Sequence, residues 1–256
     1  MNKQDLINEI TLKKEFSELP KKDVELAYGH FNKDRYVDEE KIKFTRDLLR
    51  KVFSAFTSQK ILSIKNKSPE WILKKHLSTR ERLNHYEEIY KRLFRGLNKK
   101  LSVIDLGSGI NGFSYSYFKK IKYDIDYTGI ESIGQLVNLM NNYFEKEKIK
   151  GKAIHLSLFE LEKLKRLIKD VDGKKVVFLF KTIDSLEMLK RDYSKKLISE
   201  IIPLVDRIII SFATESMITR KKFRVSRNWI INFLKEDFNI LDDFELGGER
   251  YIIFGK

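Results

Sequence analysis

Residues 101–112, with the sequence LSVIDLGSGING, constrain the fold more than any other part of the chain. Apolar and small residues lead into Asp105, and Gly107 and Gly109 follow before a segment that can start a helix. A buried strand, a tight glycine turn and a helix N-terminus together form a binding place for a small polar ligand. Glycine at these two positions lets the backbone approach that ligand, since a Cβ atom would collide with it. An ordinary strand-to-helix turn has the same pattern, so context must decide between the two.

The spacing D-x-G-x-G favours one class of cofactor. It is the spacing of S-adenosylmethionine (SAM) methyltransferases, and we therefore expect Asp105, Gly107 and Gly109 to bind SAM. The dinucleotide fingerprint of nicotinamide enzymes requires a third glycine, and Phe113, Ser114 and Tyr115 do not supply it.

From residue 99 onward, apolar runs alternate with helical segments, which implies parallel strands joined by helical crossovers. Strands are expected at 101–106, 127–131, 153–156, 176–180, 207–212, 240–246 and 251–254. Gly247 and Gly248 separate the last two, which indicates a hairpin. We therefore predict an α/β fold for residues 99–256, the Rossmann-like seven-stranded sheet of class I SAM-dependent methyltransferases.

Residues 1–98 are expected to form an all-helical, RNA-binding domain. Apolar residues recur at helical spacing from Ile42 to Phe56, and five basic residues precede or alternate with them: Lys41, Lys43, Arg46, Arg50 and Lys51. Such a helix can lie on an RNA backbone or simply pack at the surface. A second helix is expected at the sequence Ser68-Pro69-Glu70, which combines a cap, a proline and an acid in the first turn.

Composition excludes several chemistries. The 256 residues include no cysteine, which excludes disulfides, thiolate metal sites and a cysteine nucleophile. The four histidines show no metal-ligand spacing, so we expect no metal. No apolar run approaches the ~20 residues that cross a bilayer, and the N-terminus has no signal-peptide core, so we expect a cytoplasmic protein without a membrane. The net charge of +14 favours a polyanionic partner such as nucleic acid, although lysine-rich solvated surfaces give the same excess.

Candidate site residues follow the expected strands. Glu131 ends the second strand, where an acid can accept both ribose hydroxyls, and it is otherwise an exposed loop acid. Ser157 and Leu158 would flank the adenine. Lys181 and Thr182 follow the fourth strand, where base-amino methyltransferases carry an Asn/Asp-Pro-Pro-aromatic motif that is missing here. Lys181 is a poor base at neutral pH, so we expect it to position the substrate or bind phosphate, or else to be a solvated lysine.

A basic segment follows the fifth strand, at the edge of the sheet where substrates bind in such folds. Its cations are the candidate RNA contacts: Arg220, Lys221, Lys222, Arg224 and Arg227. Phe223 and Trp229 could stack on a base. A solvated charged face is the plainer interpretation of the same run.

Four motifs in this order resemble one family over nearly the whole chain. They are HLSTRER at 76–82, VIDLGSGIN, Phe180-Lys181 with Glu187, and SFATES with Arg220. The set resembles the aminoglycoside-resistance methyltransferases that modify N7 of a guanine in 16S ribosomal RNA. The resemblance implies that His76, Leu77, Ser78 and Arg82 reach SAM, with Arg82 on the methionine carboxylate. It also implies contacts from the positions after the strands: Gly109, Glu131, Ser157, Leu158 and Thr182.

Several positions depart from the family pattern. Ser157 stands where the family has aspartate, Asp184 and Ala213 replace prolines, and Glu131 replaces aspartate. Ile218-Thr219 replaces a glycine pair, Thr182 a leucine and Gly107 an alanine.

The resulting hypothesis is a SAM-dependent RNA methyltransferase of small-subunit rRNA, acting at guanine N7 as a monomer. N7 carries a free lone pair, so the enzyme mainly has to align the reacting groups. Two alternatives remain at this point: a methyltransferase acting on a protein or small molecule, and a non-catalytic RNA-binding protein with a methyltransferase fold.

Overall fold

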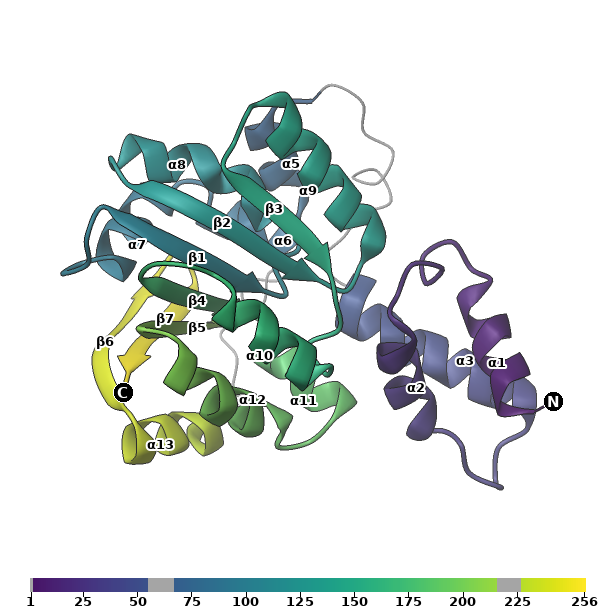
Figure 1. The fold of residues 1–256 in the computed structure, drawn as a ribbon. Helices are drawn as coiled ribbons and strands as arrows, with labels where there is room; N and C mark the ends of the chain where they lie inside the picture. Colours follow the sequence, from purple (N-terminus) through teal and green to yellow (C-terminus); the bar gives the residue numbers. More distant parts are fainter. Residues whose placement is uncertain (1, 55–66, 216–226) are drawn as a thin grey trace.

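The computed structural model describes residues 2–54, 67–215 and 227–256. Seven strands form a single sheet in the order β3-β2-β1-β4-β5-β7-β6 (Figure 1). Their bounds are β1 Lys100–Leu106, β2 Asp124–Glu131, β3 Gly151–His155, β4 Lys175–Phe180, β5 Arg207–Ala213, β6 Asn239–Leu246 and β7 Glu249–Gly255. The pairs among β1 to β5 are parallel, and β7 runs antiparallel to both β5 and β6. The predicted fold class is therefore confirmed, including the hairpin, where Gly247 and Gly248 adopt φ of +64° and +78°.

Alternate residues of each buried strand point to opposite faces of the sheet, so the strands contribute to two apolar cores. Leu101 and Val103 of β1 pack into one core, and Ile104 and Leu106 into the other. The first core is covered by α7 (Tyr86–Leu93), α8 (Tyr115–Lys120) and α9 (Gly134–Lys146). The second is covered by α10 (Leu161–Lys169), α11 (Ile183–Leu189), α12 (Tyr193–Ile201) and α13 (Asn228–Asp237).

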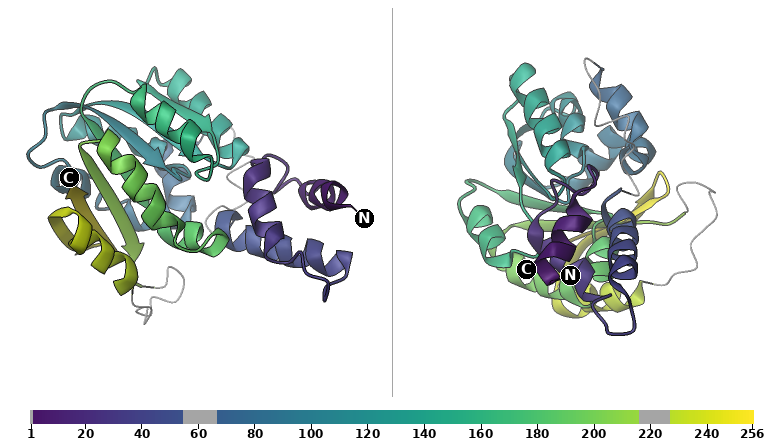
Figure 2. Two further views of the ribbon diagram at one scale, coloured as in Figure 1. Left: turned by 60° about the horizontal axis from the view of Figure 1, so that its bottom comes forward. Right: turned by 90° about the vertical axis from the view of Figure 1, so that its right-hand side faces the viewer.

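The first helices form a separate lobe that projects from the sheet body (Figures 1 and 2). This N-terminal lobe comprises α1 (Lys3–Thr11), α2 (Lys21–Gly29), α3 (Asp38–Leu49) and a π-helix, η1 (Arg50–Ser54). Arg46 of α3 bonds the carbonyl of Ile10, and Arg50 bonds the carboxylate of Glu15. Two of the five basic residues of this helix, for which the sequence left RNA contact and surface packing open, thus bond within the lobe. Residues 55 and 56 of the expected helix lie outside the described residues.

Three short helices connect the lobe to the sheet and lie against the sheet body (Figure 1). They are α5 (Pro69–Lys75), α6 (Leu77–Arg82) and α7. The predicted helix start is confirmed, since the Ser68 hydroxyl accepts a hydrogen bond from the amide of Trp71 at 3.3 Å.

The N-terminal lobe docks beside α11 and the start of α9, which follow β4 and β2. His30, the C-cap of α2, is hydrogen-bonded through Nε2 to the carbonyl oxygen of Leu189, at the end of α11, at 2.9 Å. The amide of Gly134, which opens α9, donates to the carbonyl of Glu18 at 3.3 Å. The lobe therefore covers the edge of the sheet to which the functional motifs lead.

In residues 2–54, 67–215 and 227–256, no helix is both long and apolar enough to cross a membrane. The same residues contain no group of three or more histidine and acidic side chains placed to hold a metal ion.

Candidate functional site

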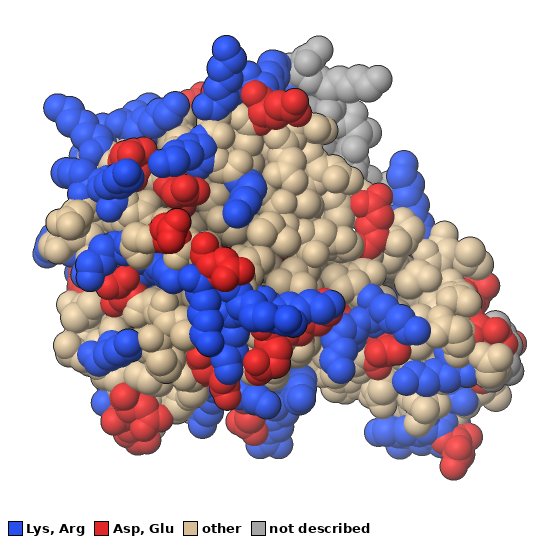
Figure 3. Space-filling view, in the orientation of Figure 1, with Lys and Arg blue, Asp and Glu red and all other residues tan. Residues whose placement is uncertain are grey.

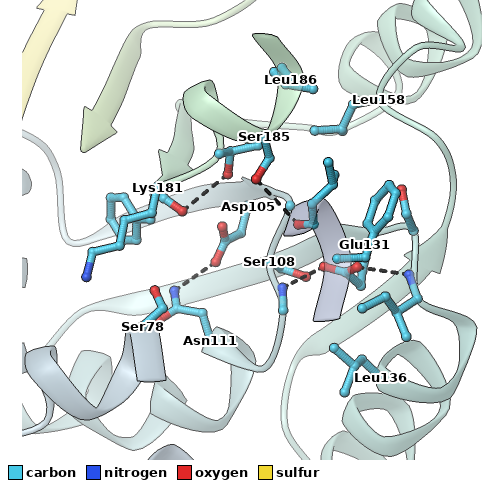
Figure 4. A pocket seen from close by; sticks show the side chains of 18 of the residues that line it. Ser78, Asp105, Ser108, Asn111, Glu131, Leu136, Leu158, Lys181, Ser185 and Leu186 are labelled. Carbon is cyan, nitrogen blue, oxygen red and sulfur yellow. Dashed lines mark hydrogen bonds between the residues drawn. The ribbon is translucent and has the colours of Figure 1, made fainter. Parts of the chain in front are cut away.

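A cavity opens at the carboxyl ends of β2, β1 and β4, beneath the N-terminal lobe (Figure 4). This is the edge at which ligands bind in open α/β sheets. The sheet body and α6 form most of its wall, and Asp23, Val52 and Phe53 reach it from the lobe. The cavity is therefore built from parts of the chain that are far apart in sequence.

The glycine bend after β1 has the geometry that its sequence predicts. Gly107 and Gly109 adopt φ of +71° and +54°, the left-handed region that favours glycine. A Cβ atom on Gly107 would lie 2.8 Å from Oγ1 of Thr182, whose hydroxyl donates to the carbonyl of Leu106 at 3.1 Å. Thr182 thus ties the ends of β1 and β4 together beside the bend.

Glu131 ends β2 and faces the bend. Its Oε2 accepts a hydrogen bond from the amide of Gly109 at 2.7 Å, and its Oε1 accepts from the amide of Ile133 at 2.9 Å (Figure 4). Burial raises the pKa of Glu131, against the lowering effect of these amide bonds. Each carboxylate oxygen has a second lone pair, so the side chain can still accept hydroxyl donors.

Asp105 lies under the bend, with 1% of its surface exposed. Its Oδ2 accepts a hydrogen bond from Nδ2 of Asn111 at 2.8 Å (Figure 4). It also accepts one from the hydroxyl of Tyr127 at 2.7 Å. Burial raises the pKa of Asp105, and the two hydrogen bonds oppose that rise. The carboxylate is thereby held in one orientation against the cavity.

Arg82 of α6 is almost fully buried and makes three hydrogen bonds. Its Nε donates to Oε2 of Glu249 at 3.1 Å, Nη1 to Oδ1 of Asn111 at 3.0 Å and Nη2 to the hydroxyl of Ser78 at 2.6 Å. Burial is the largest single effect and opposes its charge, but the Glu249 carboxylate and the neighbouring tyrosines together raise the pKa of Arg82 above its usual value. Arg82 is therefore a fixed cation at the wall of the cavity.

Lys181 joins the same charge cluster from the end of β4. Its Nζ bonds the carboxylate of Glu81 and lies 3.2 Å from Oε2 of Glu249. Burial would raise the pKa of Glu249, but Arg82 and Lys181 together hold it below its usual value. Lys181 has φ of +56°, a conformation that is rare for residues other than glycine and often occurs at functional sites. The interpretation of Lys181 as a solvated lysine is wrong, because only 9% of it is exposed.

His76 begins the contribution of α6 to the cavity. The position that a Cβ atom on Gly109 would take lies 3.5 Å from its ring. Burial, followed by the nearby charges of Arg82 and Lys181, lowers the pKa of His76 to about 3. The imidazole is therefore neutral at physiological pH.

Most of the predicted cofactor residues line this single cavity. The structure brings together His76, Ser78, Arg82, Asp105, Gly107, Gly109, Glu131, Leu158 and Thr182, as well as Lys181. Leu77 and Ser157 are absent from the lining. Ser157 is fully buried, and its hydroxyl donates to the carboxylate of Asp23, which takes the lining position instead.

Sequence reasoning missed Asp23, Asn111 and Glu249. Asp23 lies on the buried face of α2 with Val24 and Ala27. An acidic residue beside apolar positions of one helix was the signal in the sequence that could have identified it. Glu249 begins β7, and nothing in the local pattern indicates that it meets α6.

Of the predicted RNA contacts, only Arg227 lies within the described residues; Arg220, Lys221, Lys222 and Arg224 lie outside them. The Arg227 guanidinium forms a two-pronged ion pair with Asp184, at 2.7 and 3.1 Å, and also bonds the carbonyl of Ala213. Its contact with RNA stays a prediction.

The donor and acceptor set fits SAM. Two buried oxygens in the wall, Oγ of Ser108 and Oδ2 of Asp23, have no hydrogen-bond partner among the residues that the structure describes. Buried polar atoms are normally paired, so these two indicate a missing polar ligand. The lining also holds the carboxylates of Asp23, Asp105 and Glu131, which can accept from hydroxyl or amino groups, and the cation Arg82, which can pair with a carboxylate.

Comparison with known proteins agrees with this site. A model of the ribosomal RNA methyltransferase family FmrO matches residues 36–231. The 16S rRNA (guanine(1405)-N(7))-methyltransferase of Proteus mirabilis is 24% identical over 197 residues, which are 72% of this chain and 64% of that protein. The chain thus spans slightly less than two thirds of the length of this curated relative.

Solved structures show the same fold. The 16S rRNA methyltransferase RmtF, in complex with S-adenosyl-L-homocysteine, superposes with a TM-score of 0.81 at 18% identity, covering 100% of this chain and 99% of its own. An rRNA methylase from Escherichia coli gives 0.77 at 17% identity, with complete coverage of both chains. Because the family model spans most of its length, this chain belongs to the FmrO family of ribosomal RNA methyltransferases.

Proposed function

We propose that this chain is a SAM-dependent methyltransferase that modifies N7 of a guanine in small-subunit (16S) rRNA. One observation carries the proposal: the motifs converge on a single cavity with a glycine bend, a buried acid at the end of β2 and unpaired polar atoms. The names of the curated relative and of the RmtF structure support the choice of substrate.

The residues of the cavity suit the separate parts of the cofactor. Glu131 would accept the ribose hydroxyls, the bend at Gly107 and Gly109 would leave room for the sulfur side, and Arg82 would hold the methionine carboxylate. When bound, SAM supplies a methyl group on a positively charged sulfur. The protein contributes alignment of the target nitrogen with that methyl group and exclusion of water from the cavity.

No side chain of the cavity has to remove a proton from N7 of guanine, because that atom already carries a free lone pair. Lys181 suits a positioning role, since its ammonium is held between the carboxylates of Glu81 and Glu249. His76 is neutral and buried, so it adds no charge beside the methyl group. The charged cluster of Glu81, Arg82, Lys181 and Glu249 would therefore hold the wall of the cavity in place and take no part in proton transfer.

The charge of the chain fits an RNA substrate. Its net charge is +14, and Figure 3 shows lysines and arginines over the N-terminal lobe and the sheet body, with acidic residues between them. We assign RNA binding to the helical domain 1–98 and to the basic segment 220–227, and SAM binding mainly to domain 99–256. We expect the active species to be a monomer that needs no metal.

The test uses the full chain with methyl-labelled SAM and three substrates: naked 16S rRNA, small subunits and whole ribosomes. We expect label in at least one of them, and strand scission specific for N7-methylguanine should map it to one guanine. RNA affinity should fall steeply with salt, because phosphate contacts release counterions. Transfer to protein alone, or SAM binding with no transfer to any RNA, would contradict the proposal.

A further inference from the structure

The carboxylate of Asp23 is buried, although Asp23 lies in the first turn of a helix. Asp23 belongs to the first turn of α2 in the N-terminal lobe, yet its side chain reaches the end of β3 and is 1% exposed. An acid in the first turn of a helix is normally solvated, and burying a carboxylate is costly unless it is paired. Its burial therefore points to a partner at that spot.

The two oxygens of this carboxylate have different surroundings. Oδ1 accepts a hydrogen bond from the hydroxyl of Ser157, which in turn accepts one from the amide of Phe159 at 3.1 Å. Oδ2 is buried and makes no hydrogen bond of standard geometry among the described residues, although the Ser132 hydroxyl also interacts with this carboxylate. The Asp23 side chain lines the cavity. A donor on a ligand would satisfy it.

The position of Asp23 along the sheet edge identifies that donor. From β3 inward, the cavity presents Leu158 and Phe159, then Glu131 on β2, then the bend after β1. A nucleoside with its ribose at Glu131 and its sulfur beside the bend has its base toward β3. The base would then lie among the apolar side chains of Leu158 and Phe159, with the carboxylate at its polar edge.

We infer that Oδ2 of Asp23 accepts a hydrogen bond from the exocyclic amino group of the adenine of SAM. This inference rests on the proposed function, because it assumes that the cavity binds SAM. An ionised carboxylate only accepts hydrogen bonds, which matches a 6-amino group and disfavours a 6-oxo group in the same place. Ser157 then positions the carboxylate, although the resemblance places an aspartate at Ser157 itself.

A second consequence concerns the two parts of the chain. Because Asp23 lies on the N-terminal lobe and Leu158 on the sheet body, the adenine would bridge them. Docking of the lobe, through His30 and Glu18, and binding of the cofactor would therefore favour each other by the same free energy.

The experiment compares two ligands by titration calorimetry on the full chain. S-adenosyl-L-homocysteine carries the amino group, and S-inosyl-L-homocysteine carries a 6-oxo group in its place. We expect the wild type to prefer the adenosyl ligand by about 10- to 100-fold, the range for one charge-assisted hydrogen bond. No preference in the wild type would overturn the inference, and this arm depends on no variant.

The variant Asp23→Asn adds an amide donor that can bond the 6-oxo group. We expect the preference to fall to about threefold or less, mainly through weaker binding of the adenosyl ligand. Glu25→Gln makes the same chemical change on the same helix, away from the cavity lining, and should leave the preference unchanged. An equal loss of affinity for both ligands in Asp23→Asn would show that Asp23 only docks α2, and would overturn the inference.

The outcomes separate this inference from the proposed function. A wild type that binds neither ligand contradicts both. Normal preference and an Asp23-dependent ratio without methylation of rRNA contradict the proposed function alone. Methylation of rRNA with a ratio that is insensitive to Asp23 contradicts the inference alone.

Discussion

Replacing Glu249 with glutamine tests the buried charge cluster. Glu249 is fully buried and stands between two cations, with Arg82 at 3.1 Å and Lys181 at 3.2 Å. The change leaves two buried positive charges with only the Glu81 carboxylate near Lys181. Removing one partner of a buried pair costs about 3–5 kcal/mol, and we expect about 3 because glutamine keeps the shape and one acceptor oxygen. For a chain of this size, Tm should fall by about 6–12 °C.

The assay is urea and thermal unfolding of the wild type, Glu249→Gln and a matched control. Asp243→Asn removes an acid that pairs with Arg250 at 2.7 Å in the same hairpin, with side chains 27% and 31% exposed, so it should cost at most about 1 kcal/mol. The folded-state pKa of Glu249 lies below its usual value, so its stabilisation is present above about pH 4.5 and is lost as pH falls through the lower pKa. The difference in the free energy of unfolding between the wild type and Glu249→Gln should therefore become smaller as the pH is lowered. Equal losses from the two substitutions would refute the reasoning.

Three further predictions concern the glycine bend, Asp23 and the basic segment 220–227. Gly107→Ala should lower thermal stability more than Gly96→Ala, because both have positive φ but only at position 107 would the new Cβ meet a side chain, at 2.8 Å. The pKa of Asp23 is raised from 3.8 to about 6, chiefly by burial, so the folded state binds the proton more tightly than the unfolded state. In urea unfolding, wild-type stability should therefore fall relative to Asp23→Asn by about 2 kcal/mol between pH 4 and pH 7. Arg220→Ala with Arg224→Ala should spare binding of SAM in calorimetry and weaken binding of 16S rRNA in a filter assay at least tenfold.

The strands and the glycine bend could be predicted because their signals are local. A strand buried on both faces is a short apolar run, and each expected run from 101–106 to 251–254 became a strand with small shifts of its ends. The bend needs positive φ at Gly107 and Gly109, and residues other than glycine rarely adopt positive φ. The two glycines in the sequence therefore predict the bend. The carboxyl ends of parallel strands meet at one edge, and most of the cavity follows from that rule.

The contacts that complete the site could not be predicted, because they join distant positions. Asp23 meets Ser157 across 134 residues, and Arg82 meets Glu249 across 167. Periodicity places each residue on a face of its own element and says nothing of which element lies opposite. The interpretation of Lys181 as solvated failed for the same reason, since its partner Glu81 is 100 residues away.

Long-range contacts involve three of the positions that depart from the family pattern: Asp184, Ala213 and Ser157. Positions 184 and 213, where the resemblance places prolines, are here Asp184 and Ala213, and Arg227 bonds both of them. A proline restrains its own backbone, whereas this guanidinium ties the start of α11 to the end of β5. Ser157 and Asp23 form a second such pair, and under the inference above the carboxylate of Asp23 takes the role that the resemblance gives to an aspartate after β3. At Asp184 and at Ser157, the side chain that departs from the family pattern is itself bonded to a charged side chain from a distant part of the chain, so both positions keep a role in the contacts around the site.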